Sequence, residues 1–196
     1  MEPTDATGQH VHFEDDGLLR ARALERFRPS CRYLRHASVT GGGAAEPALL
    51  ARGDFSLPSS CFVEKRTRHV SAVEVTLCST QLLDYAFAEV VRQRLFAPFD
   101  RWTPEQFWAM HAGERMFLLD VHVNFRHPLD PLTLRGELEL VHITEREGRS
   151  GPLVLLDLAV RFGDARSGRC TGGVKTAVID PPAGRTPDRA PTQQPG

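Results

Sequence analysis

A histidine lies just before a serine and a glutamate near the middle of the chain, and this short stretch could carry acid–base chemistry. His69 is followed by Ser71 and then by Glu74. An imidazole changes its charge near neutral pH, so His69 could act as the general base that deprotonates an attacking group. The carboxylate of Glu74 could take a similar role. For His69, the alternative is a structural hydrogen bond to a strand.

The spacing of Ser71 and Glu74 is also that of a capping box at the start of a helix. There the serine oxygen and the glutamate carboxylate each accept a hydrogen bond from a free amide of the first turn. This role explains Glu74 without catalysis, and Ser71 could either cap the helix or orient a water molecule. The free amides around Ala72 and Val73 would lie at the positive end of the helix dipole, where they could stabilise a developing oxyanion.

Three further residues of the same segment have side chains that need a partner or a reason for burial. Thr80 lies on the apolar stripe of the predicted helix and could face a substrate, whereas a bond to the carbonyl of Thr76 is the alternative. Gln81 beside it would help to position that substrate. Cys78 has no histidine at helical spacing, so we expect a small buried side chain and not a nucleophile.

A row of polar residues, Asp120, His122 and Asn124, alternates along a later segment and invites a metal interpretation. Strand alternation alone predicts such a row, facing solvent or the edge of a dimer. We therefore predict no metal and no cofactor.

The elements that would position these residues follow from the periodicity of the apolar side chains. Val70–Leu95 contains no glycine or proline and repeats its apolar residues at helical spacing, which predicts one long helix. Gly17–Phe27 favours a short amphipathic helix. Another helix opens at Thr103, with a proline at its first position. Trp102, Phe107 and Trp108 are expected to pin that short helix to the core.

Strands are expected before and after the long helix. Tyr33–Thr40 and Ala48–Leu57 precede it. A half-buried strand follows Gly113, with one apolar face formed by Phe117, Leu119, Val121, Val123 and Phe125. The remaining strands are predicted at Thr133–Thr144, Leu153–Phe162 and Thr171–Ile179. An α+β hotdog fold, in which an antiparallel sheet curls around the long helix, would bury both apolar surfaces.

Composition narrows the class of protein. The chain has 196 residues and a net charge of −1, which predicts one domain over residues 17–180 and no binding to nucleic acid. Residues 1–16 and 181–196 are too polar to order themselves, so we expect disordered tails. The four cysteines are scattered, the start lacks the pattern of a signal peptide and the apolar runs are short. We expect a cytoplasmic protein with no membrane segment.

Three stretches resemble the FcoT-type acyl-CoA thioesterases, in the same order as in that family. The longest runs from Arg68 to Leu82 and is similar to the family's His-Phe-Asn-Ala-Val-Glu followed by Leu-Cys-x-Asn-Gln. The other two are Cys31-Arg32-Tyr33-Leu34 and the stretch from Asn124 to Pro131. The likeness covers roughly residues 27–180. It implies a homodimer, or a higher homo-oligomer, with a tunnel for an acyl chain.

We expect His69, Ser71 and Glu74 to be the catalytic residues. Substrate contacts are expected from Tyr33, Phe62, Arg68, Ala72, Val73, Thr80 and Gln81. Four tyrosine or asparagine positions of the family carry other residues here: Phe27, Phe62 or Val63, Ser71 and Thr80.

We therefore expect a thioesterase that acts on fatty acyl-CoA or acyl-carrier-protein thioesters. A related subgroup adds glycine to an α,β-unsaturated acyl thioester before hydrolysis, as in β-amino acid and isonitrile lipopeptide biosynthesis. In that case a basic residue such as Arg66 or Arg68 could hold the glycine carboxylate. A hotdog dehydratase or hydratase that uses His69 with Glu74, and a non-catalytic acyl-binding module, are the alternatives.

Overall fold

The computed structural model describes residues 10–42, 49–64, 68–113, 115–149, 151–179 and 181. The predicted tail at 181–196 lies almost wholly outside these residues, and so does Arg66. The predicted tail at 1–16 needs a correction, because its last part belongs to the fold. Strand β1 (Val11–Phe13) pairs with β2, and the Asp16 carboxylate caps helix α1. A three-residue strand is too short to show alternation in the sequence.

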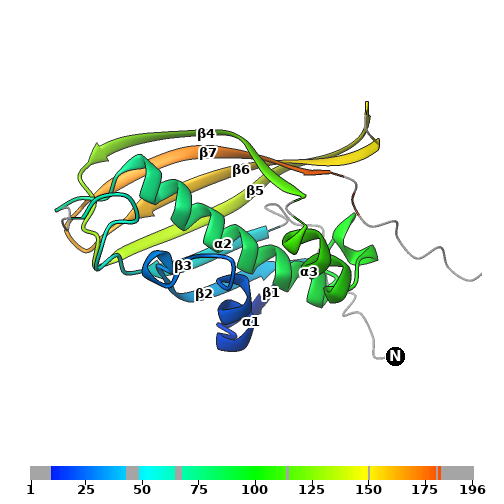
Figure 1. The fold of residues 1–196 in the computed structure, drawn as a ribbon, viewed down its shortest axis with the longest axis horizontal. Helices are drawn as coiled ribbons and strands as arrows, with labels where there is room; N and C mark the ends of the chain where they lie inside the picture. The colour runs from blue at the N-terminus through cyan, green and yellow to red at the C-terminus, as the bar shows by residue number, and fades with distance from the viewer. Residues whose placement is uncertain are drawn as a thin grey trace, which may run out of the picture.

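The predicted long helix is confirmed as α2 (Ala72–Gln93), which runs through the centre of the molecule (Figure 1). Ser71 and Glu74 form the expected capping box at its start, and Arg94 ends it in the left-handed conformation. Every residue from Gln81 to Val91 is buried. A helix that is buried on all sides over three turns must be enclosed by other elements.

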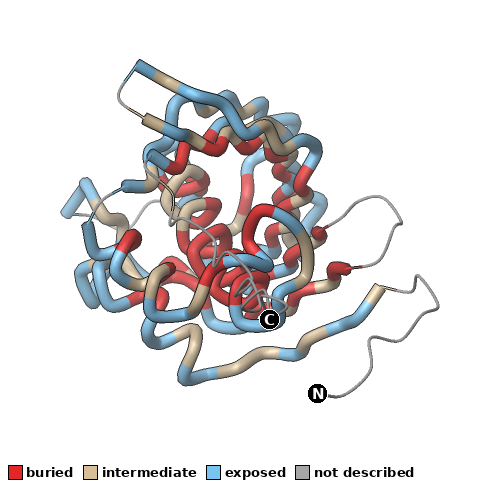
Figure 2. Tube along the Cα trace, turned by 90° about the vertical axis from the view of Figure 1, so that its right-hand side faces the viewer, coloured by how far each residue is buried: buried red, intermediate tan, exposed pale blue. Residues whose placement is uncertain are grey.

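A seven-stranded antiparallel sheet encloses α2, in the strand order β1-β2-β3-β5-β6-β7-β4. Its other strands are β2 (Leu34–Gly41), β3 (Leu49–Phe55), β4 (Met116–His127), β5 (Leu134–Gly148), β6 (Gly151–Gly163) and β7 (Arg169–Ile179). In Figures 1 and 2 the sheet curls around the helix, and the buried residues gather on its inner side. The predicted α+β hotdog fold is confirmed.

Strand β4 differs from the predicted half-buried strand. Its alternation breaks at a bulge between Leu118 and Asp120, so Phe117 pairs with Ala177 and does not share a face with Val121. Phe117 and Leu119 are 45% and 55% exposed. The strand lies at the edge of the sheet, which explains why its apolar side chains are not covered.

The two shorter helices pack against α2. Helix α1 (Gly17–Ala23) is four residues shorter than the predicted segment, and α3 (Pro104–Ala112) begins after its cap Thr103 as predicted. The buried carboxylate of Asp84 on α2 has a partner from each of these regions. It lies 3.0 Å from the guanidinium of Arg26, just after α1, and 3.2 Å from the imidazole of His111 on α3. These ion pairs tie both helical regions to the central helix. Among the described residues, no helix is long and apolar enough to cross a membrane.

Candidate active site at the start of the central helix

A pocket of about 410 Å³ lies where the start of α2 meets the end of β4. Both ends lie at the same end of the molecule in Figure 1. From the helix side the pocket is lined by His69, Val70 and Ser71, and from the strand side by Phe125, Arg126, His127 and Pro128. A backbone hydrogen bond from Val70 to the carbonyl of Leu129, 3.1 Å long, ties the two walls together. His69, the candidate base, and Ser71, the helix cap, therefore line the same pocket.

In the capping box, the side chains of Ser71 and Glu74 hydrogen-bond to each other and to each other's backbone amides. One carboxylate oxygen of Glu74 accepts from the Ser71 amide at 2.8 Å and from the Ser71 hydroxyl at 3.0 Å. The Glu74 side chain is also buried. This oxygen of Glu74 therefore fixes the first turn of α2.

The first turn of α2 leaves two amides without an intrahelical acceptor. Ala72 and Val73 are the first residues of the helix, and both are exposed. Their N–H groups lie at the positive end of a 22-residue helix. This is the arrangement that stabilises negative charge on a carbonyl oxygen.

His69 lies in the exposed part of the pocket wall. Within the described residues, its ring makes no hydrogen bond or ion pair. The predicted alternative, a structural bond from His69 to a strand, is therefore absent from this part of the chain. An imidazole with no protein partner is available to a ligand in the pocket.

Thr80 and Gln81 do not reach this pocket. The Thr80 hydroxyl donates to the carbonyl of Thr76 at 2.9 Å, which is the alternative that the sequence left open. The Gln81 side chain binds the strand that follows the first helical region: its oxygen accepts from the amides of Tyr33 and Leu34, and its nitrogen donates to the carbonyl of Cys31. Gln81 is fully buried, and these bonds engage both ends of its amide.

Tyr33, whose amide is bound by Gln81, is buried and does not line the pocket. Its hydroxyl donates to the carbonyl of Ser59 at 3.1 Å. Burial, with a smaller effect from the thiol of Cys61, raises the pKa of Tyr33 well above its ordinary value. Tyr33 therefore remains a neutral hydrogen-bond donor at physiological pH.

The cysteines of this region are poor nucleophiles. Burial raises the pKa of the Cys78 thiol well above its ordinary value and also raises that of Cys61. Because the thiolate is the reactive form, neither residue is suited to attack a thioester. The predicted role of Cys78 as a small buried side chain agrees with its full burial.

The remaining predicted contacts, Phe62 and Arg68, are not among the residues that line this pocket. Phe62 is 52% exposed, and Arg68 is exposed and lines a neighbouring pocket with Arg166, Asp130 and Asp164. The carboxylate of Asp164 holds the loop between these pockets by accepting from the amides of Asp130, Arg166 and Gly168. Burial alone would raise the pKa of Asp164, but these amide bonds outweigh it and lower the pKa below its ordinary value.

Sequence reasoning does not assign the strand-side wall, Phe125–Pro128, to the site. In the sequence these residues are noted only as part of the stretch from Asn124 to Pro131 that resembles the thioesterase family. The alternation of the strand assigns Phe125 to its apolar face. A second bulge, between Phe125 and His127, brings Arg126 to the pocket. The position of a bulge cannot be read from alternation, so this wall is hidden in the sequence.

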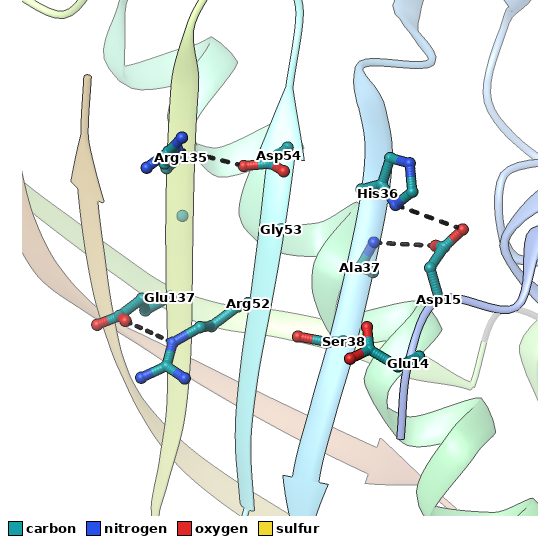
Figure 3. A pocket seen from close by; sticks show the side chains of 11 residues that line it. Glu14, Asp15, His36, Ala37, Ser38, Arg52, Gly53, Asp54, Arg135 and Glu137 are labelled. Carbon is teal, nitrogen blue, oxygen red and sulfur yellow. Dashed lines mark hydrogen bonds and ion pairs between the residues drawn. The ribbon is translucent and has the colours of Figure 1, made fainter. Parts of the chain in front are cut away.

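A second groove of about 420 Å³ lies on the opposite side of the sheet from α2, across β2, β3 and β5 (Figure 3). Four of its charged side chains pair across the strands: Arg52 with Glu137 at 2.8 Å, and Arg135 with Asp54 at 3.5 Å. A surface ladder of paired charges stabilises strand pairing and offers little to a ligand.

The polar row on β4 lies on the outer face of the sheet. His122 lies over Gly173, whose missing side chain makes room for the imidazole. Within the part of the chain that the structure describes, no group of three or more His, Cys, Asp or Glu residues is placed to hold a metal ion.

Comparison with known proteins identifies the family. Residues 22–178 match the model of the FcoT-like thioesterase domain. The chain is 34% identical over 168 residues to a (2E)-enoyl-[ACP] glycyltransferase of Streptomyces coeruleorubidus, covering 85% of this chain and 99% of the relative. It is 29% identical over 192 residues to one of Mycobacterium marinum, covering 93% and 100%.

The fold is shared with a solved structure from Syntrophus aciditrophicus that is provisionally named a thioesterase. The TM-score is 0.51 at 11% identity, over 83% of this chain and 95% of that one. The fold, the pocket at the start of α2 and the match over most of the chain agree with one another: the chain belongs to the FcoT-like thioesterase family and is an enzyme that acts on acyl thioesters.

Proposed function

We propose that this enzyme adds glycine to a (2E)-enoyl thioester carried by an acyl carrier protein and then hydrolyses the product. The observation that carries the proposal is that His69, whose imidazole has no partner among the described residues, lines one pocket together with Ser71, the cap that directly precedes the free first-turn amides of α2. The names of the relatives support the choice of glycine and of a carrier-protein thioester.

The first step forms a carbon–nitrogen bond. His69 takes a proton from the ammonium group of glycine, and the free amine attacks the β-carbon of the enoyl group. The electron pair of the double bond moves onto the thioester oxygen, where the amides of Ala72 and Val73 stabilise the resulting enolate. Protonation of the α-carbon by the imidazolium completes the addition and restores neutral His69.

Hydrolysis can use the same groups. A water molecule that loses its proton to His69 attacks the thioester carbonyl, and the same two amides stabilise the tetrahedral oxyanion. Collapse of this intermediate expels the thiolate of the carrier, which takes up the proton from His69. One base and one oxyanion site therefore suffice for both steps.

The proposed biological unit is a homodimer formed through the edge strand β4. Phe117, Leu118, Leu119 and Phe125 of this strand are between 36% and 55% exposed. An apolar edge strand with unpaired backbone groups is a template for another strand, and a second copy offers an identical one. We also propose a cytoplasmic location, where acyl carrier proteins are loaded.

The test is incubation of the full chain with a (2E)-enoyl thioester of an acyl carrier protein, with and without glycine, followed by mass spectrometry. We expect a mass gain equal to one glycine and glycine-dependent release of free thiol. A gain of water without thiol release would indicate a hydratase. No product from any thioester would indicate a non-catalytic acyl-binding module.

A further inference from the structure

Arg126 is placed in the pocket by the second bulge of β4. The strand pairs with β7 through Phe125–Cys170 and His127–Arg169, and the register shifts between these pairs, so Arg126 has no partner on β7. A bulge redirects the side chain of its extra residue. Here that residue lines the same pocket as His69 and Ser71.

The guanidinium of Arg126 is unpaired within the part of the chain that the structure describes. Among the described residues it makes no ion pair and no hydrogen bond, whereas the arginines of the outer face, Arg52, Arg135 and Arg161, each contact a carboxylate. A planar guanidinium that is free of partners can receive both oxygens of a carboxylate at once. Arg126 therefore supplies an anion-binding group beside the candidate base.

Arg68, the basic residue that the sequence suggested for the glycine carboxylate, has a different setting. Its pocket also contains Arg166, Asp130 and Asp164, so the charges of the two arginines are balanced by two carboxylates that would oppose an anion there. The pocket of Arg126 has no acidic residue among those that line it. Charge therefore favours Arg126 over Arg68 as the partner of a small carboxylate.

We propose that Arg126 binds the carboxylate of glycine and thereby favours an amino acid over an amine without a carboxylate as the donor. The inference rests on the proposed function and specifies which group recognises the second substrate. A single carbon separates the amine of glycine from its carboxylate, so a carboxylate held by Arg126 keeps the amine in the pocket that His69 lines. Arg126 is thus a binding and positioning residue, and His69 remains the base.

The test measures KM and kcat for glycine with a (2E)-enoyl thioester of N-acetylcysteamine as the acceptor. This acceptor has no phosphate, so an effect on glycine cannot come from the phosphate of a carrier arm. For Arg126→Ala we expect the KM for glycine to rise about tenfold to a hundredfold, as for loss of a charged hydrogen-bonded pair. Arg126→Lys keeps the charge but loses the two-pronged contact, so its KM should rise less.

Glycinamide provides the second arm, because it has the same amine but no carboxylate. The ratio of kcat/KM between Arg126→Ala and the wild type should be close to one for glycinamide and far below one for glycine. The matched control is Arg166→Ala, which removes the same charge from a residue that is 83% exposed in the neighbouring pocket. We expect its KM for glycine to remain within about twofold of the wild type.

The outcomes separate this inference from the proposed function. If the wild type adds glycine but Arg126→Ala leaves its KM unchanged, Arg126 is not the carboxylate site and the proposed function stands. The same conclusion follows if the variant loses activity equally with both amines. If the wild type releases thiol without adding glycine, the proposed function and this inference fail together. Thermal unfolding of each variant verifies that it is folded.

Discussion

The backbone amide of Tyr33, at the start of β2, donates a buried hydrogen bond of 2.9 Å to the side-chain oxygen of Gln81 in the middle of α2. The same oxygen accepts from the next amide of the strand, and the Gln81 nitrogen donates to a carbonyl just before it. One glutamine thus fixes the start of β2 on the central helix. The residue that sequence similarity marked as a substrate contact therefore has a structural role in this protein.

Replacement of Gln81 by methionine should destabilise the protein, because three buried backbone groups would lose their partner. We expect the free energy of unfolding to fall by about 2–4 kcal/mol, measured by urea denaturation. The control is Thr80→Val, which removes one bond within the helix and should cost less than about 1 kcal/mol. If Gln81→Met left stability unchanged but raised KM for the thioester, Gln81 would be a substrate contact instead.

Glu74→Gln separates the cap from the chemistry. A glutamine side chain still offers an oxygen to the Ser71 amide but cannot transfer a proton. We expect the turnover of Glu74→Gln to be within about threefold of the wild type. For Glu74→Ala, which loses the cap, we expect the free energy of unfolding to fall by about 1 kcal/mol. A loss of about a hundredfold or more in kcat for a normally stable Glu74→Gln protein would make Glu74 a catalytic acid or base and would favour the dehydratase alternative.

The Asp164 carboxylate should make stability depend on acid pH. Because its pKa is lower in the folded protein than in the unfolded chain, its contribution is complete above about pH 5 and is lost as the pH falls through the folded-state value. The free energy of unfolding of Asp164→Asn should lie about 1 kcal/mol below that of the wild type at pH 7, and the two should converge toward pH 3. A constant difference over that range would show that the charge of Asp164 contributes nothing.

Leu119 tests the proposed dimer edge. We expect the wild type to sediment as a dimer at micromolar concentration and Leu119→Lys to shift toward the monomer, because a buried lysine in a strand pair is unfavourable. Leu18→Lys is the matched control, since Leu18 is 86% exposed on α1, away from this edge. A monomeric wild type, or a dimer that tolerates the lysine on β4, would contradict the proposal.

The spacing of apolar side chains is sufficient to predict α2, α3 and most of the sheet, because it reflects which sides of each helix or strand are buried. The capping residues Ser71 and Thr103 are read correctly for the same local reason. The bulges of β4 follow from its pairing with β7, which no local pattern reports. Because of the first bulge, alternation assigns Phe117 to the wrong face, and because of the second it does not place Arg126 in the pocket. The helix side of the site could therefore be predicted from the sequence, and the strand side could not.

The most direct test of the central claim is the yield of the glycine adduct from a (2E)-enoyl carrier-protein thioester, compared between the wild type and His69→Ala. We expect the wild type to form the adduct and the variant to lose at least about a hundredfold in rate, as for removal of a general base, while it remains folded and still binds the thioester. Equal rates of adduct formation in the two proteins would contradict the assignment of His69, and with it this account of the site.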